Sequence, residues 1–328
     1  MYTRLLLLSL LFIPFVASAQ SLGEIGTSDP FSISVTPQYP APYSDVRITP
    51  MSGALDLTGA TIIASVSGKE IYRGNARFFT VTLGRAGSPT TIKVTATSGG
   101  LNYIGTVTVM PQDVALVVEP ISYAPPLYAG KPLIPLEGKV RMVAVASLRT
   151  PSGAAIDPIK NSYLWTIDGV RMATLSGVGK MTALVDAPLQ YRTRSVDVVV
   201  TSADLSLVGG ATVTLSGYEP SIRIYENDPL LGIRFDRAVA GSYTLTGAEA
   251  SLYAVPFSFP ISNDNPLIEW FLNGALAQTG NSITFRPTGS GQGSASLSLV
   301  ASSNDATKVF TQLSLSFGAN SGFNLFGL

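Results

Sequence analysis

The feature that most constrains the fold is a short pattern that returns three times, at a spacing of about one hundred residues. In each copy apolar and polar residues alternate and end in a polar residue followed by Gly. The closing residues Gly68, Gly169 and Gly274 lie 101 and 105 residues apart. Alternation of this kind predicts a β-strand that runs into a tight turn. The three copies are 64–68 (Ala-Ser-Val-Ser-Gly), 165–169 (Trp-Thr-Ile-Asp-Gly) and 270–274 (Trp-Phe-Leu-Asn-Gly).

Further strands follow each copy in the same order, and no sustained helical period appears after the first 19 residues. This pattern, with turn residues between the strands, is typical of antiparallel β-sandwiches. A strictly alternating strand is predicted at 91–97, 195–201 and 294–300, and a closing strand at 105–110, 211–215 and 312–317. Upstream, 117–119 matches 224–226, and 142–145 matches 252–255.

The repeats predict an all-β protein of three tandem immunoglobulin-like antiparallel β-sandwiches, because units of about 100 residues have that size. We call them segment 1 (31–112), segment 2 (113–220) and segment 3 (221–318). Short Pro-containing joints separate them, so we expect the domains to touch end to end as a semi-rigid rod. Trp165 and Trp270 are predicted in the cores, whereas Ala64 indicates a smaller or differently packed core in segment 1.

The ends of the chain carry different signals. A basic start, an apolar stretch over 5–16 and Ala17-Ser18-Ala19 predict a signal peptide (1–19) that is cleaved after Ala19. A polar linker (20–30) follows. The protein is therefore expected to be extracytoplasmic, secreted or at the surface of a bacterium, and not an integral membrane protein. The apolar end (319–328) is expected either to dock on a partner or to pack back onto segment 3.

Composition excludes several classes of function. The chain has 21 basic and 21 acidic residues, and removing Arg4 with the signal peptide leaves a net charge of −1, which offers nothing to attract nucleic acid. It contains neither histidine nor cysteine. Most nucleophile–base pairs, disulfides and transition-metal sites are thereby excluded. No Ser-x-x-Lys or Gly-x-Ser-x-Gly motif is present. We predict no enzyme activity, no catalytic residue and no cofactor.

Calcium is the one cofactor with some support. Oxygen-bearing side chains cluster in 226–228 (Glu-Asn-Asp) and 263–265 (Asn-Asp-Asn). Asn and Asp are also common turn formers, and neither stretch matches a defined calcium loop. We therefore assign no metal ligand.

Two Pro-Tyr stretches and the apolar end are the candidate partner-binding sites. Proline prevents ladder pairing, so 39–43 and 123–128 are predicted as broken strands at a sheet edge. Their aromatic rings would stack on a sugar or contact a partner; the alternative is edge protection and packing between domains. The candidate residues are Tyr39, Tyr43, Tyr123, Tyr128, Phe323, Leu325, Phe326 and Leu328.

The Trp-x-Ile/Leu-Asp/Asn-Gly turns at 165–169 and 270–274, with the alternating strands after them, resemble bacterial Ig-like and PKD-like surface modules. The whole chain resembles exported three-domain Ig-like proteins of candidate-phyla bacteria. Segment 1 departs from the pattern because it lacks the Trp. The resemblance implies display, spacing or adhesion. We therefore predict a non-catalytic, exported cell-surface protein that presents binding surfaces to a protein or a surface glycan. The alternative is an array of carbohydrate-binding modules.

Overall fold

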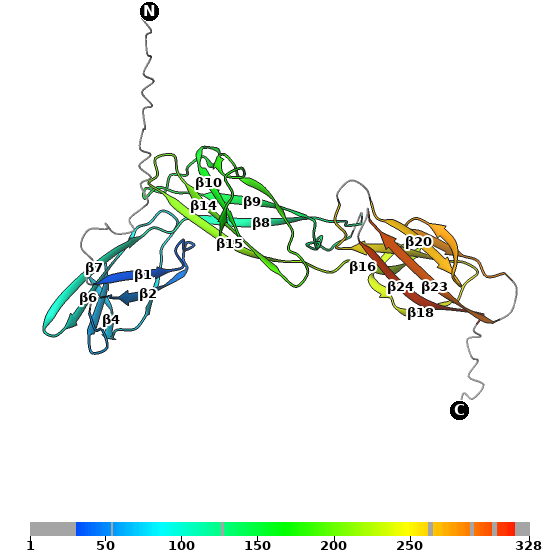
Figure 1. The fold of residues 1–328 in the computed structure, drawn as a ribbon, viewed down its shortest axis with the longest axis horizontal. Helices are drawn as coiled ribbons and strands as arrows, with labels where there is room; N and C mark the ends of the chain where they lie inside the picture. Colours follow the sequence, from blue (N-terminus) through cyan, green and yellow to red (C-terminus); the bar gives the residue numbers. More distant parts are fainter. Residues whose placement is uncertain are drawn as a thin grey trace, which may run out of the picture. The chain divides into compact units, whose positions relative to one another are not determined.

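The computed structural model describes residues 31–53, 55–125, 128–261, 265–288, 292–303 and 307–318. The predicted signal peptide, linker and apolar tail lie outside these residues. The regular secondary structure of the described chain is almost entirely β-strand (Figure 1), which confirms the predicted all-β fold class. Its one helical element is a single 3-10 turn, Pro158–Lys160. In this part of the chain no helix has the length and apolarity that crossing a membrane requires.

In the described residues six sheets fall in chain order into three pairs, one pair for each segment, and segments 1 and 2 share one plan. In both, the first, second and fifth main strands form one sheet, and the third, fourth, sixth and seventh form the other. This is a two-sheet arrangement of the immunoglobulin-like type. In segment 1 the sheets are β1 (Ser32–Thr36), β2 (Asp45–Met51) and β5 (Phe79–Thr82), and β4 (Lys69–Asn75), β3 (Thr61–Val66), β6 (Thr90–Ser98) and β7 (Leu101–Val109). In segment 2 they are β13 (Thr182–Asp186), β9 (Lys139–Ser147) and β8 (Asp113–Ile121), and β11 (Val170–Arg171), β10 (Ser162–Ile167), β14 (Thr193–Thr201) and β15 (Val208–Ser216), with β12 (Gly177–Val178) also paired to β10.

Segment 3 keeps this plan and adds two strands between its first and second main strands. One forms a hairpin with the first strand, and the other pairs in parallel with the last strand, β24. The sequence repeat did not predict either addition. The two sheets are β17 (Gly232–Val239), β16 (Ser221–Asp228), β19 (Ala250–Phe257) and β22 (Ser282–Phe285), and β18 (Gly241–Leu245), β24 (Lys308–Phe317), β23 (Gly293–Ser302), β20 (Leu267–Leu272) and β21 (Ala275–Thr279).

In segments 2 and 3 the two sheets face each other across a shared apolar core with a tryptophan in it. Trp165 lies opposite Val198, and Trp270 lies opposite Leu299. Both rings are fully buried, as predicted. Each indole Nε1 donates to a carbonyl oxygen, at 2.9 Å and 2.8 Å, so neither ring leaves a buried donor unpaired. Ala64 occupies the corresponding position of β3 and is also fully buried.

The three repeated turns have one backbone geometry. Both central residues take a positive φ, which favours Gly and tolerates Asn and Asp, and this is the tight turn that joins antiparallel strands. The predicted turns are therefore confirmed. The φ values are 51° and 82° at Ser67 and Gly68, 49° and 79° at Asp168 and Gly169, and 50° and 84° at Asn273 and Gly274.

The chain divides into two compact units. One comprises 1–34, 48–79 and 91–107, and the other comprises 35–47, 80–90 and 108–328. The second unit thus holds segments 2 and 3 together with three stretches of segment 1. The boundary between the units falls inside segment 1, and the three stretches of segment 1 in the second unit include residues that contact segment 2.

Candidate docking surfaces

The second unit contains a first joint, where stretches of segment 1 meet segment 2. Gln112 is buried, and its side chain binds the backbone of Arg149 twice. Its Oε1 accepts from the Arg149 N–H at 2.8 Å, and its Nε2 donates to the Arg149 carbonyl at 3.1 Å. The Arg85 guanidinium donates to the Pro151 carbonyl at 3.0 Å. The Tyr39 ring lies so close to Gly210 that a Cβ there would stand 2.7 Å from a ring carbon.

A second joint, between segments 2 and 3, is made by the connection from β8 to β9. We call this connection the segment 2 insertion (122–138). It begins as a continuation of β8 alongside the end of β19 in segment 3. The Tyr123 N–H donates to the Phe259 carbonyl at 3.0 Å, and the Ile261 N–H donates to the Ile121 carbonyl at 3.3 Å. Backbone pairing therefore carries the chain from one segment to the next, and a flexible linker would not supply it.

Two buried serines complete the second joint. The Ser258 Oγ lies 2.7 Å from the Tyr218 carbonyl and 3.2 Å from the Ile134 carbonyl. The Ser122 Oγ donates to the Leu133 carbonyl at 2.6 Å. Each buried hydroxyl therefore has an acceptor, and a buried donor without one would cost about 1–3 kcal/mol. The sequence offered no signal for Ser258 or Gln112, because a polar residue in a loop is ordinarily exposed.

An aromatic cluster closes the joint from the side of segment 3. Tyr128 of the segment 2 insertion packs edge-on against Phe235 and Phe257, with ring centroids 5.5 Å and 5.3 Å apart. Tyr225 packs against Phe235 at 5.2 Å. Tyr225 and Phe257 lie with the buried Val255 on the outer face of the sheet that contains β16 and β19. Edge-to-face pairs of this kind add about 0.5–1.5 kcal/mol each beyond the apolar area that they bury.

The four candidate tyrosines do not share one exposed surface. Tyr39, Tyr123 and Tyr128 are half-buried at the two joints, whereas Tyr43 is 72% exposed. The Tyr123 hydroxyl accepts from the Asn281 Nδ2 at 3.4 Å, and burial raises its pKa. The described residues therefore bring three of the four into packing between segments, and binding of an outside partner stays a prediction. Phe323, Leu325, Phe326 and Leu328 lie outside the described residues.

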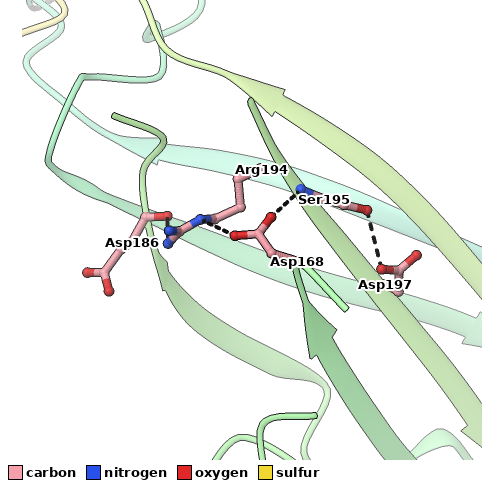
Figure 2. Close-up of polar contacts among 5 residues, drawn as sticks. All are labelled: Asp168, Asp186, Arg194, Ser195 and Asp197. Atoms are coloured by element: carbon pink, nitrogen blue, oxygen red, sulfur yellow. Dashed lines mark hydrogen bonds and ion pairs between the residues drawn. The ribbon is translucent and has the colours of Figure 1, made fainter. Parts of the chain in front are cut away.

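Segment 2 also carries a polar cluster at its repeated turn (Figure 2). The Asp168 carboxylate accepts from the Ser195 N–H at 2.9 Å and pairs with the Arg194 Nε at 3.1 Å. Arg194 donates to the Asp186 carbonyl at 3.0 Å. The Ser195 hydroxyl donates to the Asp197 carboxylate at 3.3 Å. A serine hydroxyl beside carboxylates invites the question of nucleophilic chemistry.

The same turn in segment 3 indicates a structural role for this cluster. There the Asn273 Oδ1 accepts from the Ser296 N–H at 2.8 Å, which reproduces the contact of Asp168 without its charge. The Asp197 carboxylate also accepts from Thr212 at 2.6 Å, and the chain has no histidine that could act as a base toward Ser195. Serine nucleophiles need such a base. The cluster anchors the turn between β10 and β11 to β14.

The structure describes all of one stretch considered for calcium, 226–228, and only part of the other, 263–265. In 226–228 the oxygens already accept hydrogen bonds: Glu226 from the Tyr243 hydroxyl at 3.2 Å, and Asp228 from the backbone N–H groups of Leu231 and Leu230 at 2.9 Å and 2.8 Å. Those backbone bonds lower the pKa of Asp228. Asn263 and Asp264 lie outside the described residues. Within the described ranges no group of three or more Asp or Glu side chains gathers that could hold a metal ion.

A cleft of about 500 Å³ lies beside this stretch, between β17 and β18. Three of its charged groups have partners within the cleft: Arg234 pairs with Asp236 at 3.1 Å, and Glu226 accepts from Tyr243. Burial, with the nearby Glu226 carboxylate, raises the pKa of Tyr243 to about 12. Small-molecule sites are usually concave and apolar with a few polar groups aimed inward. This open and mostly polar cleft does not have that character.

The strand order and the shared cores define the chain as a series of immunoglobulin-like β-sandwich modules. Comparison with known proteins adds only broad resemblances. No protein-family model matches the chain, and no curated protein matches it. Solved structures that align with it include "Sidekick-1 immunoglobulin domains 1-5", at 11% identity over 85% of this chain and 56% of that one, with a TM-score of 0.29. This chain thus spans just over half of that structure.

Two further alignments are with other domain arrays. The "Three N-terminal domains of the bacteriophage RB49 Highly Immunogenic Outer Capsid protein (Hoc)" align at 13% identity over 87% of this chain and 98% of that one, with a TM-score of 0.24. The "Central Fibronectin-III array of RIM-binding protein" aligns at 10% identity over 85% and 95%, with a TM-score of 0.27. Since these TM-scores are low, the fold assignment rests on the strand order and the cores.

Proposed function

We propose that the chain is a non-catalytic, exported structural or adhesive protein, whose three segments are immunoglobulin-like domains that space and present contact surfaces. The observation that carries this proposal is the joint between segments 2 and 3. Its backbone pairing, buried serines and aromatic cluster resist bending in a way that a short loop alone would not. A module array that only tethered independent binders would have no use for such a joint.

Composition supports the non-catalytic part of the proposal. The chain has no histidine and no cysteine, and the Asp197 carboxylate that accepts from the Ser195 hydroxyl also accepts from Thr212. A protein partner is favoured over a glycan, because Tyr39, Tyr123 and Tyr128 contribute to the joints and do not form a row of exposed rings. Export through the signal peptide and attachment through 319–328 remain predictions from the sequence.

The test is a measurement of stiffness across the second joint. Spin labels on Val178→Cys in segment 2 and Leu276→Cys in segment 3, both exposed positions, give the distribution of distances between the segments by pulsed EPR. The chain has no natural cysteine, so only these sites are labelled. We expect one narrow distribution for the parent. Tyr128→Ala should broaden it at least twofold, because the insertion loses its aromatic contacts.

Tyr43→Ala is the matched control, since it removes a tyrosine that is exposed and distant in sequence from the second joint. It should leave the distribution unchanged. Trp165 and Trp270 report folding in each core, and their fluorescence should be the same in all variants. A parent distribution that is already broad, or one that Tyr128→Ala does not change, would refute the spacer function.

A further inference from the structure

The first strand hairpin of segment 3 ends in an uncovered apolar tip. Leu230 and Leu231 lie at the turn between β16 and β17 and are 93% and 71% exposed. Their backbone is fixed, because one carboxylate oxygen of Asp228 accepts both of their N–H groups. Two adjacent leucines held outward in a single backbone conformation lose little conformational freedom on docking. Exposed apolar surface of this kind usually marks a contact site.

A second uncovered apolar surface lies on segment 2. It is the outer face of the sheet β13–β9–β8, where Val117 stands directly opposite Val143. Val117, Val145 and Leu184 are 44%, 53% and 51% exposed. The ion pairs Lys139–Asp186 and Arg141–Glu119 lie on the same face at its rim. An apolar centre with a charged rim is the usual arrangement of a protein interface.

The structure shows what covers the equivalent face of segment 3. Strand pairing places Leu116 opposite Ala144 in segment 2, and Ile224 opposite Ala254 in segment 3. All four side chains lie in the apolar cores or pack against them. The outward neighbours Val117 and Val145 therefore correspond to Tyr225 and Val255. Those two are only 4% and 0% exposed. Tyr128 and Leu133 of the segment 2 insertion, with Ile233 and Phe235 of β17, cover them.

The strands that carry the hairpin tip and the open face also reach this joint. Phe235, which follows the tip on β17, is already part of the aromatic cluster, and β8, which carries Val117, runs on into the joint at Ile121. In this chain, therefore, the connection that follows the first strand of segment 2 docks on the outer face of a sheet in segment 3. In the described chain the tip of the segment 3 hairpin and the outer face of the sheet β13–β9–β8 are both uncovered.

We propose that the Leu230–Leu231 tip of one copy docks on the Val117–Val145–Leu184 face of a second copy. This inference rests on the proposed docking role of these connections. The side chains involved expose only a few hundred Å², below the roughly 1,200 Å² that a stable interface buries in total. A single contact is therefore weak. Since every copy carries both surfaces, a pair or a row of copies multiplies the contacts.

Disulfide trapping between two single-cysteine variants tests the proposal. The full chain carrying Leu231→Cys is mixed with the full chain carrying Val145→Cys under mild oxidation. We expect at least tenfold more mixed dimer than from Leu231→Cys with Val170→Cys, which places a cysteine at a slightly more exposed position on the other sheet of segment 2. Adding Leu230→Ser to the first chain and Val117→Ser to the second should reduce the yield to that of the control.

If the tip binds a different surface, disulfide trapping gives a different product. Equal yields from the test and control mixtures would overturn the proposal. So would a dominant product that joins two Leu231→Cys chains, because that would be tip-to-tip contact. A chain carrying both Leu231→Cys and Leu325→Cys that closes on itself as a monomer would assign the tip to the chain's own 319–328 stretch and also overturn it. The spin-label distances report on segments within one chain, so they can succeed while trapping fails.

Discussion

Segments 2 and 3 have the same strand plan and the same kind of core, yet they differ in the connection between their first and second main strands. In segment 2 the connection is the insertion 122–138, which leaves its own sandwich and packs on the next one. In segment 3 it forms a hairpin and a parallel strand on its own sandwich, and its tip is uncovered. The repeated residues fix the sandwich, and the variable connection decides what that sandwich contacts.

The largest expected effect comes from removing the core tryptophans. Trp165→Ala and Trp270→Ala each leave a cavity and an unpaired carbonyl, so each should cost about 3–5 kcal/mol in its own segment. Hydrogen exchange of peptides that cover β14 and β23 measures the protection of segments 2 and 3 separately. If the segments differ only in their connections, each variant should lower protection mainly in its own segment.

Val170→Ala, at the exposed end of the repeated turn, is the control and should cost less than about 0.5 kcal/mol. Equal loss of protection in β14 and β23 after either tryptophan substitution would break the comparison, because segments 2 and 3 would then unfold as a single cooperative unit held by the joint.

A smaller effect is expected at the turn anchor, where segment 2 has Asp168 and segment 3 has Asn273. Asp168→Asn keeps the acceptor for the Ser195 N–H and loses only the partly exposed ion pair with Arg194, so it should cost at most about 1 kcal/mol. Asp168→Ala and Asn273→Ala lose the acceptor and place Ala at a positive φ, and each should cost about 1–3 kcal/mol. Urea unfolding followed by tryptophan fluorescence measures all three. If Asp168→Asn is as costly as Asp168→Ala, the charge of Asp168 matters and the two turns are not equivalent.

Much of the sandwich plan follows from the sequence, because a strand that buries one face must alternate and a turn with two positive φ values must use Gly and Asn, Asp or Ser. The 165–169 and 270–274 stretches predicted the strand, the buried tryptophan and the turn in both segments. The β17–β18 addition was not predicted, since parallel pairing with β24 depends on a distant strand and leaves no local pattern.

The docking surfaces were harder to predict. At 117–118 and 224–225 two apolar residues stand side by side, so both faces of the strand are apolar, and that is a detectable signal of a second contact. This sequence pattern does not indicate whether the outer face is covered, as at Tyr225, or exposed, as at Val117. The Pro-Tyr stretches stand out in the sequence, but only the tertiary structure places Tyr39 on Gly210 and Tyr128 on Phe257.

The smallest expected effect concerns Tyr243, whose bond to Glu226 ties β18 to β16 in segment 3. Burial, with the Glu226 carboxylate nearby, raises the pKa of Tyr243 to about 12, whereas an unfolded tyrosine titrates near about 10. Its contribution to stability is therefore complete below about pH 10 and is lost as the pH rises towards 12. Tyr243→Phe removes this dependence. The urea midpoint of the parent should fall more steeply than that of Tyr243→Phe between pH 10 and 12, while Tyr43→Phe should follow the parent. Parallel curves of urea midpoint against pH for the parent and Tyr243→Phe would mean that the Tyr243–Glu226 hydrogen bond does not stabilise β18. Segment 3 would then differ from segment 2 in backbone pairing alone.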